Sequence, residues 1–181
     1  MNEMLSQKRL VAEFKRMMKE FPPGKSPVKW RIIENDLRRY EVKIRGKPGT
    51  PYEGGVFRMR IELPEEYPMK PPIVNALTKI WHPNIAVDRQ YKWGSNVCHS
   101  LINWDNIGKV GGWKPTIFLP TVVEHLEMML ELREAENNQY PLYIVNPDDP
   151  FNLEAGLQLK KDYKKFEKKA KEWTKKYATE E

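Results

Sequence analysis

Three runs rich in β-branched and aromatic residues follow one another closely in this chain, and they limit what it can fold into more than any other feature. They cover Val28–Glu34, Arg39–Arg45 and Val56–Leu63. The second and third runs alternate apolar with polar residues, which is the pattern of a strand with one buried face. Turn-forming residues at Asn35-Asp36 and over 46–55 separate the runs. The sequence therefore predicts an antiparallel meander.

Amphipathic segments that predict helices lie before and after this meander. Residues 2–21 place apolar side chains at steps of three and four, while residues 116–137 and 152–177 show a similar periodicity. A fourth strand is expected over Ile73–Ile80, after the rigid segment Tyr67–Pro72. The side chains expected to face inward are Leu10, Phe14, Met17, Met18 and Phe21, then Val122, Val123, Leu126, Met129 and Leu130, and finally Leu157, Tyr163, Phe166, Ala170 and Trp173. This order predicts an α+β fold with the helices packed on one side of the sheet.

Length and charge narrow the classes of protein further. The 181 residues suit one domain, 1–181, with an extended basic helical region at about 152–179. Residues 160–176 hold nine Lys against three acidic residues, which accounts for the whole net charge of +6. Nine Lys without an Arg on a helix are typical of a solvated face, so we expect no nucleic-acid partner.

The apolar residues are too scattered for a membrane protein. No apolar run approaches the roughly 20 residues that a spanning helix needs. Residues 1–20 mix charged with apolar side chains, which a signal peptide does not do. We therefore expect a cytoplasmic protein without a membrane partner.

The segment from Trp81 to Lys114 lacks helical or strand periodicity, and a stretch of that length inside a domain is unusual unless it is functional. It contains His82-Pro83-Asn84 and the only cysteine, Cys98, which excludes an internal disulfide and a four-cysteine zinc site. Each feature alone is weak. A lone cysteine is often a small buried apolar residue, and Asp149 could simply cap the following helix.

Taken in order, the motifs are more specific. They are Tyr52-Glu53-Gly54-Gly55-Val56-Phe57, Tyr67-Pro68-Met69-Lys70-Pro71-Pro72, His82-Pro83-Asn84-Ile85, Cys98, Trp113-Lys114-Pro115 and Asn146-Pro147-Asp148-Asp149-Pro150. Over nearly its whole length the chain resembles the ubiquitin-conjugating enzyme family. The resemblance implies that family's fold, with an N-terminal helix, a four-stranded meander, a long active-site loop and C-terminal helices.

The resemblance also implies an acyltransferase. Cys98 would accept ubiquitin or a ubiquitin-like protein from an activating enzyme as a thioester, then pass it to a substrate lysine. Asn84 would either donate to the oxyanion or support the loop, and Asp149 would orient and deprotonate the lysine. Such a site needs no cofactor and no metal.

Partner surfaces follow from the same resemblance. Lys8 and Arg9 match basic positions that engage the activating enzyme, although an ordinary solvated face would look the same. Met69, Pro115 and Thr116 match the two loops that RING-type ligases contact. An exposed apolar side chain such as Met69 in a rigid loop is typical of a transient interface.

The chain departs from the family pattern by three insertions, near residues 86–97, 103–112 and 132–143. His99 also places an imidazole next to the thiol, where many members have leucine. These differences leave the assignment of Cys98 as the nucleophile in place.

Three other functions fit parts of the sequence. A non-catalytic ubiquitin-binding module could share the fold but would lack the cysteine after His-Pro-Asn. A thiol hydrolase would need His82, His99 or His125 as the base for Cys98. A zinc site is possible by ligand count from the same four residues, but their spacing matches no common pattern.

Overall fold

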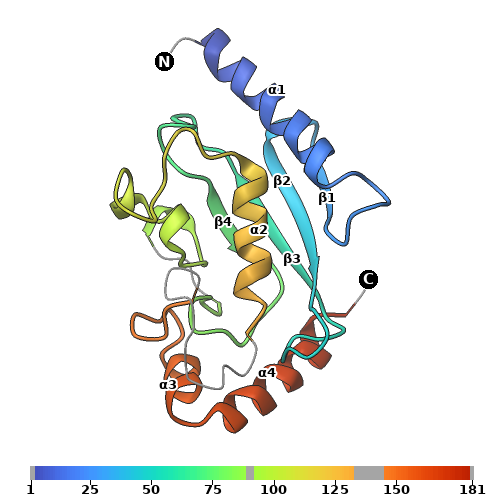
Figure 1. Ribbon diagram of the computed structural model, residues 1–181, viewed down its shortest axis with the longest axis vertical. Coiled ribbons are helices and arrows are strands. Elements are labelled where there is room, and N and C mark those ends of the chain that lie inside the picture. Colours follow the sequence, from blue (N-terminus) through green and yellow to red (C-terminus); the bar gives the residue numbers. More distant parts are fainter. Residues whose placement is uncertain (1–2, 89–91, 133–144, 180–181) are drawn as a thin grey trace.

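A four-stranded antiparallel sheet with strand order β1-β2-β3-β4 forms the centre of the protein, and α2 covers one face of it (Figure 1). The computed structural model describes residues 3–88, 92–132 and 145–179. The strands are β1 (Lys29–Ile33), β2 (Asp36–Arg45), β3 (Val56–Glu62) and β4 (Ile73–Ala76). The helices are α1 (Glu3–Glu20), α2 (Leu119–Met129), α3 (Leu153–Lys161) and α4 (Tyr163–Tyr177), with short 3₁₀ turns η1 (Lys92–Gly94), η2 (Ser100–Ile102) and η3 (Trp104–Asn106). The expected α+β fold is confirmed.

Alternation along β2 and β3 decides which face of the sheet is buried. Val42 pairs with Met59 and Ile44 with Phe57, and all four side chains are buried. The first turn lies one residue earlier than expected, at Glu34 and Asn35, which have φ values of 54° and 56°. A two-residue hairpin turn of this kind needs positive φ at both central positions, so the next residue already belongs to β2.

The fourth strand is shorter than the sequence predicts, because the chain turns away at Leu77. The backbone N–H groups of Leu77 and Thr78 both donate to the carbonyl of Arg58, and the Thr78 hydroxyl accepts from the Arg58 N–H. Regular pairing with β3 therefore ends at Ala76. The β-branched residues beyond it, such as Ile80, are buried as part of a loop.

The inner face of α1 differs from the expected apolar stripe. Leu10, Met17 and Phe21 are buried as expected, but Met18 is 41% exposed. Glu13 takes a core position and is fully buried. A pattern based on apolar residues alone misses a buried carboxylate, since such a group is stable only with partners from elsewhere in the fold.

The segment expected to form one helix over residues 116–137 forms α2 only over Leu119–Met129. Its start is delayed by a turn in which the Ile117 N–H donates to the Lys114 carbonyl over 2.9 Å. Its expected inner face is confirmed, since Val122, Val123, Leu126, Met129 and Leu130 are all buried. The expected end of the helix and the insertion at 132–143 fall almost entirely outside the described residues.

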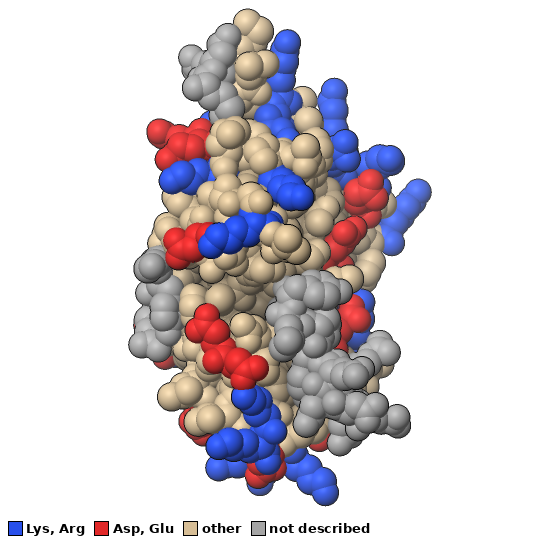
Figure 2. All heavy atoms as spheres, turned by 60° about the vertical axis from the view of Figure 1, so that its left-hand side comes forward, with Lys and Arg blue, Asp and Glu red and all other residues tan. Residues whose placement is uncertain are grey.

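The last helical region is divided at Asp162, whose backbone leaves the helical conformation with φ −153° and ψ 75°. Its side chain caps α4 by accepting from the Lys165 N–H over 3.0 Å. Because of this break, α3 does not continue the helical phase of α4, and it buries Ala155 and Leu159. Leu157 is 45% exposed, so the expectation that it faces inward is wrong. The basic side chains of α3 and α4 are all Lys, and blue side chains lie at that lower end of the molecule as well as at its upper end (Figure 2). No helix within the described ranges is long and apolar enough to cross a membrane.

Candidate active site

Cys98 lies beside Asn84 because two segments of the long loop pair with each other. The Cys98 N–H donates to the Asn84 carbonyl over 2.8 Å, and Ile85 forms an antiparallel bridge with Val97. The insertion starts directly after Ile85 and ends at Val97, the two residues of this bridge. The insertion at 86–97 therefore does not move Cys98 away from the His82–Asn84 segment.

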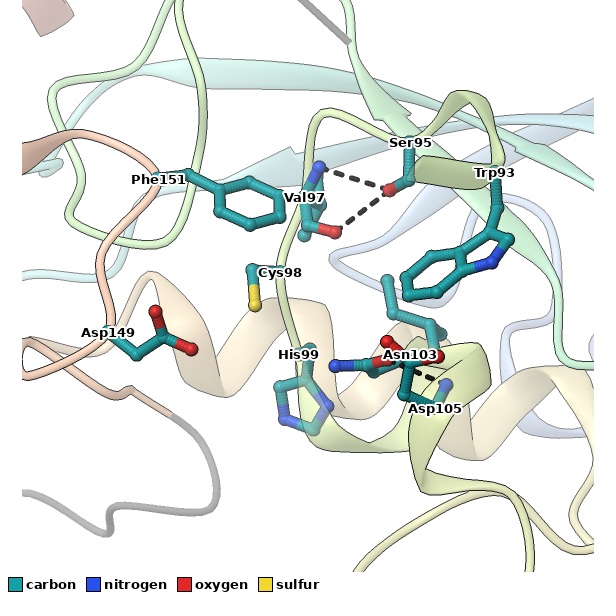
Figure 3. Close-up of a pocket in the computed structure, with 10 residues that line it drawn as sticks. Trp93, Ser95, Val97, Cys98, His99, Asn103, Asp105, Asp149 and Phe151 are labelled. Carbon is teal, nitrogen blue, oxygen red and sulfur yellow. Dashed lines mark hydrogen bonds between the residues drawn. The ribbon is translucent and has the colours of Figure 1, made fainter. Parts of the chain in front are cut away.

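A pocket of about 220 Å³ lies beside the thiol (Figure 3). Asp149 and Phe151 reach it from the loop before α3, and Trp93 faces it from the segment before Cys98 (Figure 3). The lining residues are Trp93, Ser95, Val97, Cys98, His99, Ile102, Asn103, Asp105, Asp149 and Phe151. The fold thus brings together a thiol and a carboxylate that lie about 50 residues apart in the sequence.

His82 is a buried structural residue. Its Nδ1 accepts from the Asn84 N–H over 3.0 Å, so the neutral ring carries its proton on Nε2, which donates to the Met129 carbonyl over 3.0 Å. Burial lowers the pKa of His82 to about 4, partly opposed by the bond to the Met129 carbonyl. Both ring nitrogens are occupied, so His82 holds the loop against the end of α2.

The amide of Asn84 joins the loop of the thiol to the loop of Asp149. Its Nδ2 donates to the Asn146 carbonyl over 2.8 Å and, more weakly, to the Asp149 carbonyl over 3.5 Å. Its Oδ1 accepts from the Asn146 N–H over 2.8 Å. A further bond from the Asn152 N–H to the Pro83 carbonyl, over 2.9 Å, joins the same two segments. Both the nitrogen and the oxygen of the Asn84 amide are therefore hydrogen-bonded within the protein.

The environment of Cys98 favours the thiol over the thiolate. Burial raises the pKa of Cys98 to about 11, and the negative charge of Asp149 acts in the same direction. Reactive cysteines with a low pKa have a neighbouring cation or a helix N-terminus instead. At neutral pH the resting group is therefore protonated, and its proton must leave during acyl transfer.

His99 and His125 form a neutral pair next to the thiol. His99 Nδ1 accepts from the Leu101 N–H over 3.0 Å and so caps η2. The other nitrogen, Nε2, lies 3.3 Å from Nδ1 of His125. Burial, followed by the neighbouring His125 and His82, lowers the pKa of His99 to about 3.

These contacts do not form the base of a thiol hydrolase, because such a base needs a free nitrogen beside the sulfur. Both nitrogens of His82 and of His99 have partners, and His125 does not line the pocket beside the thiol. Within the described ranges, no group of three or more potential ligating side chains could hold a metal ion. The arrangement leaves the thiol facing a carboxylate, which suits attack on an acyl group and then attack by an amine.

Arg9 differs from the exposed basic residue that the sequence suggested. Its side chain is 15% exposed and pairs with Glu13 over 2.7 Å. Its guanidinium also donates to the Pro115 carbonyl over 2.7 Å, to the Ile117 carbonyl and to the Tyr67 hydroxyl. Because these bonds join α1 to both expected ligase loops, Arg9 has a structural position.

The other expected contact residues lie on the surface to different degrees. Lys8 and Thr116 are exposed, Met69 is 57% exposed and Pro115 is half-buried. Trp113 between these loops is fully buried, and its Nε1–H donates to the Pro68 carbonyl over 2.7 Å. This bond keeps Met69 and Pro115 on neighbouring loops.

Several site residues were not found from the sequence. Trp93, Asn103 and Asp105 belong to the two inserted segments, whose fold has no periodic signal. Phe151 follows the Asn146–Pro150 motif and could have been suspected only from its nearness to Asp149.

Comparisons with known proteins agree with this geometry. A profile of the family described as "Ubiquitin-conjugating enzyme" matches residues 9–174. The chain is 32% identical over 172 residues to Ubiquitin conjugating enzyme E2 B of Dictyostelium discoideum, covering 93% of this chain and 99% of that protein. It is 32% identical over 171 residues to Ubiquitin-conjugating enzyme E2 13 of Schizosaccharomyces pombe, covering 94% and 97%.

A solved structure gives the same result for the fold. The E2 domain of a Toxoplasma gondii ubiquitin conjugating enzyme superposes with a TM-score of 0.71 at 29% identity, covering 96% of this chain and 99% of that one. A meander covered by α2, with the thiol on the long loop that follows it, defines the class of conjugating acyltransferases. The chain belongs to the ubiquitin-conjugating enzyme family. Enzymes of this family are transferases that carry a ubiquitin-like protein as a thioester after receiving it from an activating enzyme.

Proposed function

We propose that Cys98 is the residue that carries the modifier, and that Asp149 assists its transfer to a lysine amine. The observation that carries this proposal is the pocket in which the Cys98 thiol and the Asp149 carboxylate meet (Figure 3). Chain 1–181 would act as one catalytic domain, since its buried core includes residues from α1 to α4.

Loading exchanges one thioester for another. Cys98 sulfur attacks the carbonyl carbon of the modifier held on the activating enzyme, a new C–S bond forms, and the old C–S bond breaks. The proton that leaves Cys98 ends on the departing thiol. A leaving thiol of high pKa departs slowly. The raised pKa of Cys98 therefore helps the thioester to persist until an amine is in position.

Discharge forms an amide. The lysine nitrogen attacks the same carbonyl carbon, the C–N bond forms, the C–S bond breaks, and Cys98 regains a proton. Asp149 is exposed beside the sulfur, so its carboxylate can attract the lysine ammonium and accept the proton that the nitrogen loses. Asn84 acts here as loop support, because its bonds to Asn146 and Asp149 hold the carboxylate's loop in place.

The proposed partner surfaces are Lys8 for the activating enzyme and Met69, Pro115 and Thr116 for a RING-type ligase. The bonds of Arg9 and Trp113 fix the two ligase loops relative to each other, so a ligase would meet one rigid apolar patch. A reducing compartment such as the cytoplasm suits the proposal, because Cys98 must remain a free thiol.

The direct test is to incubate the protein with an activating enzyme, ATP and ubiquitin or a ubiquitin-like protein. We expect an adduct that reductant removes, and Cys98→Ser should convert it into a stable oxyester or abolish it. A reductant-sensitive adduct that persists on Cys98→Ala would overturn the assignment of Cys98.

The ligase surface is tested separately. We expect Met69→Ala to weaken binding of a cognate RING-type ligase by about tenfold or more in moderate salt. A matched variant with Lys164, Lys165, Lys168 and Lys171 changed to Gln should bind nearly as well as the parent, since exposed charges act mainly through screened attraction. The opposite result would place the ligase on the face of α4.

A further inference from the structure

One wall of the pocket beside Cys98 takes no part in the proposed chemistry. Its apolar lining consists of Trp93, Val97, Ile102 and Phe151, and two of these, Trp93 and Phe151, are half-buried aromatic residues. Trp93 and Phe151 come from different segments and flank the thiol (Figure 3). A binding pocket with apolar walls and a few polar groups is the usual form of a recognition site.

Trp93 is held in an unusual backbone conformation. Its φ is 62° and its ψ is 14°, a left-handed conformation that is rare for a bulky residue. Such conformations persist where the surrounding structure fixes them. Here the Trp93 ring stacks on Trp104, with ring centroids 6.0 Å apart and planes 13° from parallel. The stack gives the pocket a fixed aromatic wall.

A third segment completes this support. The Lys70 ammonium lies 4.2 Å from the ring centroid of Trp104, close enough for a cation–π contact. Lys70 belongs to the Tyr67–Pro72 segment, directly after the exposed Met69. The wall is therefore fixed before any ligand arrives, and a preformed aromatic surface loses little entropy on binding.

Charge and size indicate what the pocket can take. Asp105 and Asp149 line it and are exposed, so the entrance attracts a cation and disfavours an acidic residue. The volume of about 220 Å³ is below that of typical sites for drug-sized ligands, so it suits a single side chain. Because Asp149 is the group that receives the lysine in the proposed function, this is the acceptor side of the thiol.

We propose that the pocket is an acceptor subsite, in which Trp93 and Phe151 receive an apolar or aromatic side chain adjacent in sequence to the acceptor lysine. This inference rests on the proposed transfer from Cys98 to lysine. It defines the substrate class as lysines with an apolar neighbour and no acidic neighbour. Trp104 and Lys70 are positioning residues for this subsite, because they hold the Trp93 ring.

The test compares short peptides as acceptors for the thioester-loaded full chain. Each peptide has one lysine flanked on both sides by Phe, by Gly or by Glu, and the loss of the thioester is followed over time. We expect the Phe peptide to discharge the thioester about tenfold faster than the Gly peptide, and the Glu peptide to be the slowest.

Variants assign the preference to the aromatic wall. The ratio of the Phe rate to the Gly rate should fall to about one in Trp93→Ala and in Trp104→Ala, and Trp104→Phe should restore most of it because a stacked ring remains. Lys70→Gln should lower the ratio by about two- to fivefold, as expected for one lost cation–π contact. Trp173→Ala is the matched control: Trp173 is also half-buried and contacts two aromatic rings, Trp81 and Tyr177, but it does not line the pocket, so the ratio should be kept.

A measurement on the unmodified protein does not depend on the folding of the variants. The side-chain N–H signal of Trp93 should shift on titration with the Phe peptide and should not shift with the Gly peptide. Equal rates for the Phe and Gly peptides, or a preference that survives Trp93→Ala, would overturn the subsite. Failure to form any thioester on Cys98, before a peptide is added, would instead overturn the proposed function on which the subsite rests.

Discussion

The two ends of α2 are both held by side chains from distant parts of the chain, but by opposite chemistry. At the N-terminal end, the Leu119 N–H donates to the Glu13 carboxylate over 2.7 Å, and Arg9 pairs with the same carboxylate. At the C-terminal end, the Met129 carbonyl accepts from the neutral ring of His82. One end is held by a buried ion pair and the other by a neutral imidazole.

The difference follows from what each end of a helix lacks. Phe118 precedes α2 and offers no side-chain cap, so Glu13 from α1 supplies the missing acceptor. A carboxylate suits the positive end of the helix dipole, but a buried charge needs several partners. Glu13 has Arg9, the Tyr67 hydroxyl and the Leu119 N–H. The N-terminal end of α2 therefore depends on more partners than the C-terminal end. Removing the Glu13 carboxylate should lower the free energy of unfolding more than removing the His82 ring.

The largest effect is expected at the charged end. Glu13→Leu leaves the Arg9 guanidinium without its carboxylate and the Leu119 N–H without its acceptor. Removal of one partner of a buried ion pair typically costs about 3–5 kcal/mol. We expect that loss in the free energy of unfolding, measured by urea denaturation. Glu13→Leu combined with Arg9→Leu should regain part of it, and a double variant as unstable as the sum of two singles would argue against an uncompensated charge as the cause.

The neutral end should be sensitive to pH. The pKa of His82 is lowered to about 4 and that of His99 to about 3, while a histidine in the unfolded chain titrates near 6.5. Below pH 6.5 the unfolded state therefore binds more protons, so stability is complete above that pH and falls as the pH decreases toward 4. We expect unfolding free energies from urea denaturation to decrease by about 2 kcal/mol for each of these two histidines from pH 7 to pH 5. His82→Gln keeps a donor and an acceptor but cannot titrate, and an unchanged pH slope in this variant would exclude His82 as a source.

A smaller loss of stability is expected for the hydrogen bonds between Asn84 and Asn146, which lie near the surface. Asn84→Ala removes the partner of the Asn146 N–H and carbonyl, and because Asn146 is exposed water can replace part of the bonding. We expect a loss of about 1–2 kcal/mol, together with roughly tenfold slower discharge to lysine as the loop of Asp149 loosens. Thermal unfolding and single-turnover discharge measure the two effects. Slower discharge with no loss of stability would contradict loop support and favour a contact with the oxyanion.

The smallest effect is expected for an ion pair in water. Lys171 and Glu167 lie 2.7 Å apart on α4, one turn from each other, with side chains 54% and 35% exposed. Such pairs contribute less than about 0.5 kcal/mol because solvent screens them. Lys171→Gln should therefore leave the urea midpoint almost unchanged. A loss comparable to that of Glu13→Leu would show that burial is not what separates the two ion pairs.

Much of the framework could be predicted from local patterns. Alternation identified the inner face of β2 and β3, and the helical periodicity of α2 identified its buried side. Where a break interrupts the pattern the prediction fails, as at Asp162, which turns Leu157 outward. Local periodicity describes a face only as long as one element continues.

The candidate site was predicted in part. His82-Pro83-Asn84, Cys98 and Asp149 were selected from their order along the chain, and the pocket brings Cys98 and Asp149 together. No sequence pattern predicted the stacking of Trp93 on Trp104. The two rings belong to different inserted segments, and their contact depends on how the tertiary structure positions each segment.

The sequence by itself determined the four strands, the main helices and the single thiol, since each depends on residue type and local spacing. Only the tertiary structure decided that the Arg9 guanidinium turns inward to the carbonyls of Pro115 and Ile117. It also brought Lys29, Lys43 and Arg58 side by side on the sheet, although the chain outside residues 160–176 has no net charge. The physical reason is that ion pairs, hydrogen bonds and charge clusters act over a few ångströms in space, between residues whose separation along the chain carries no repeating pattern.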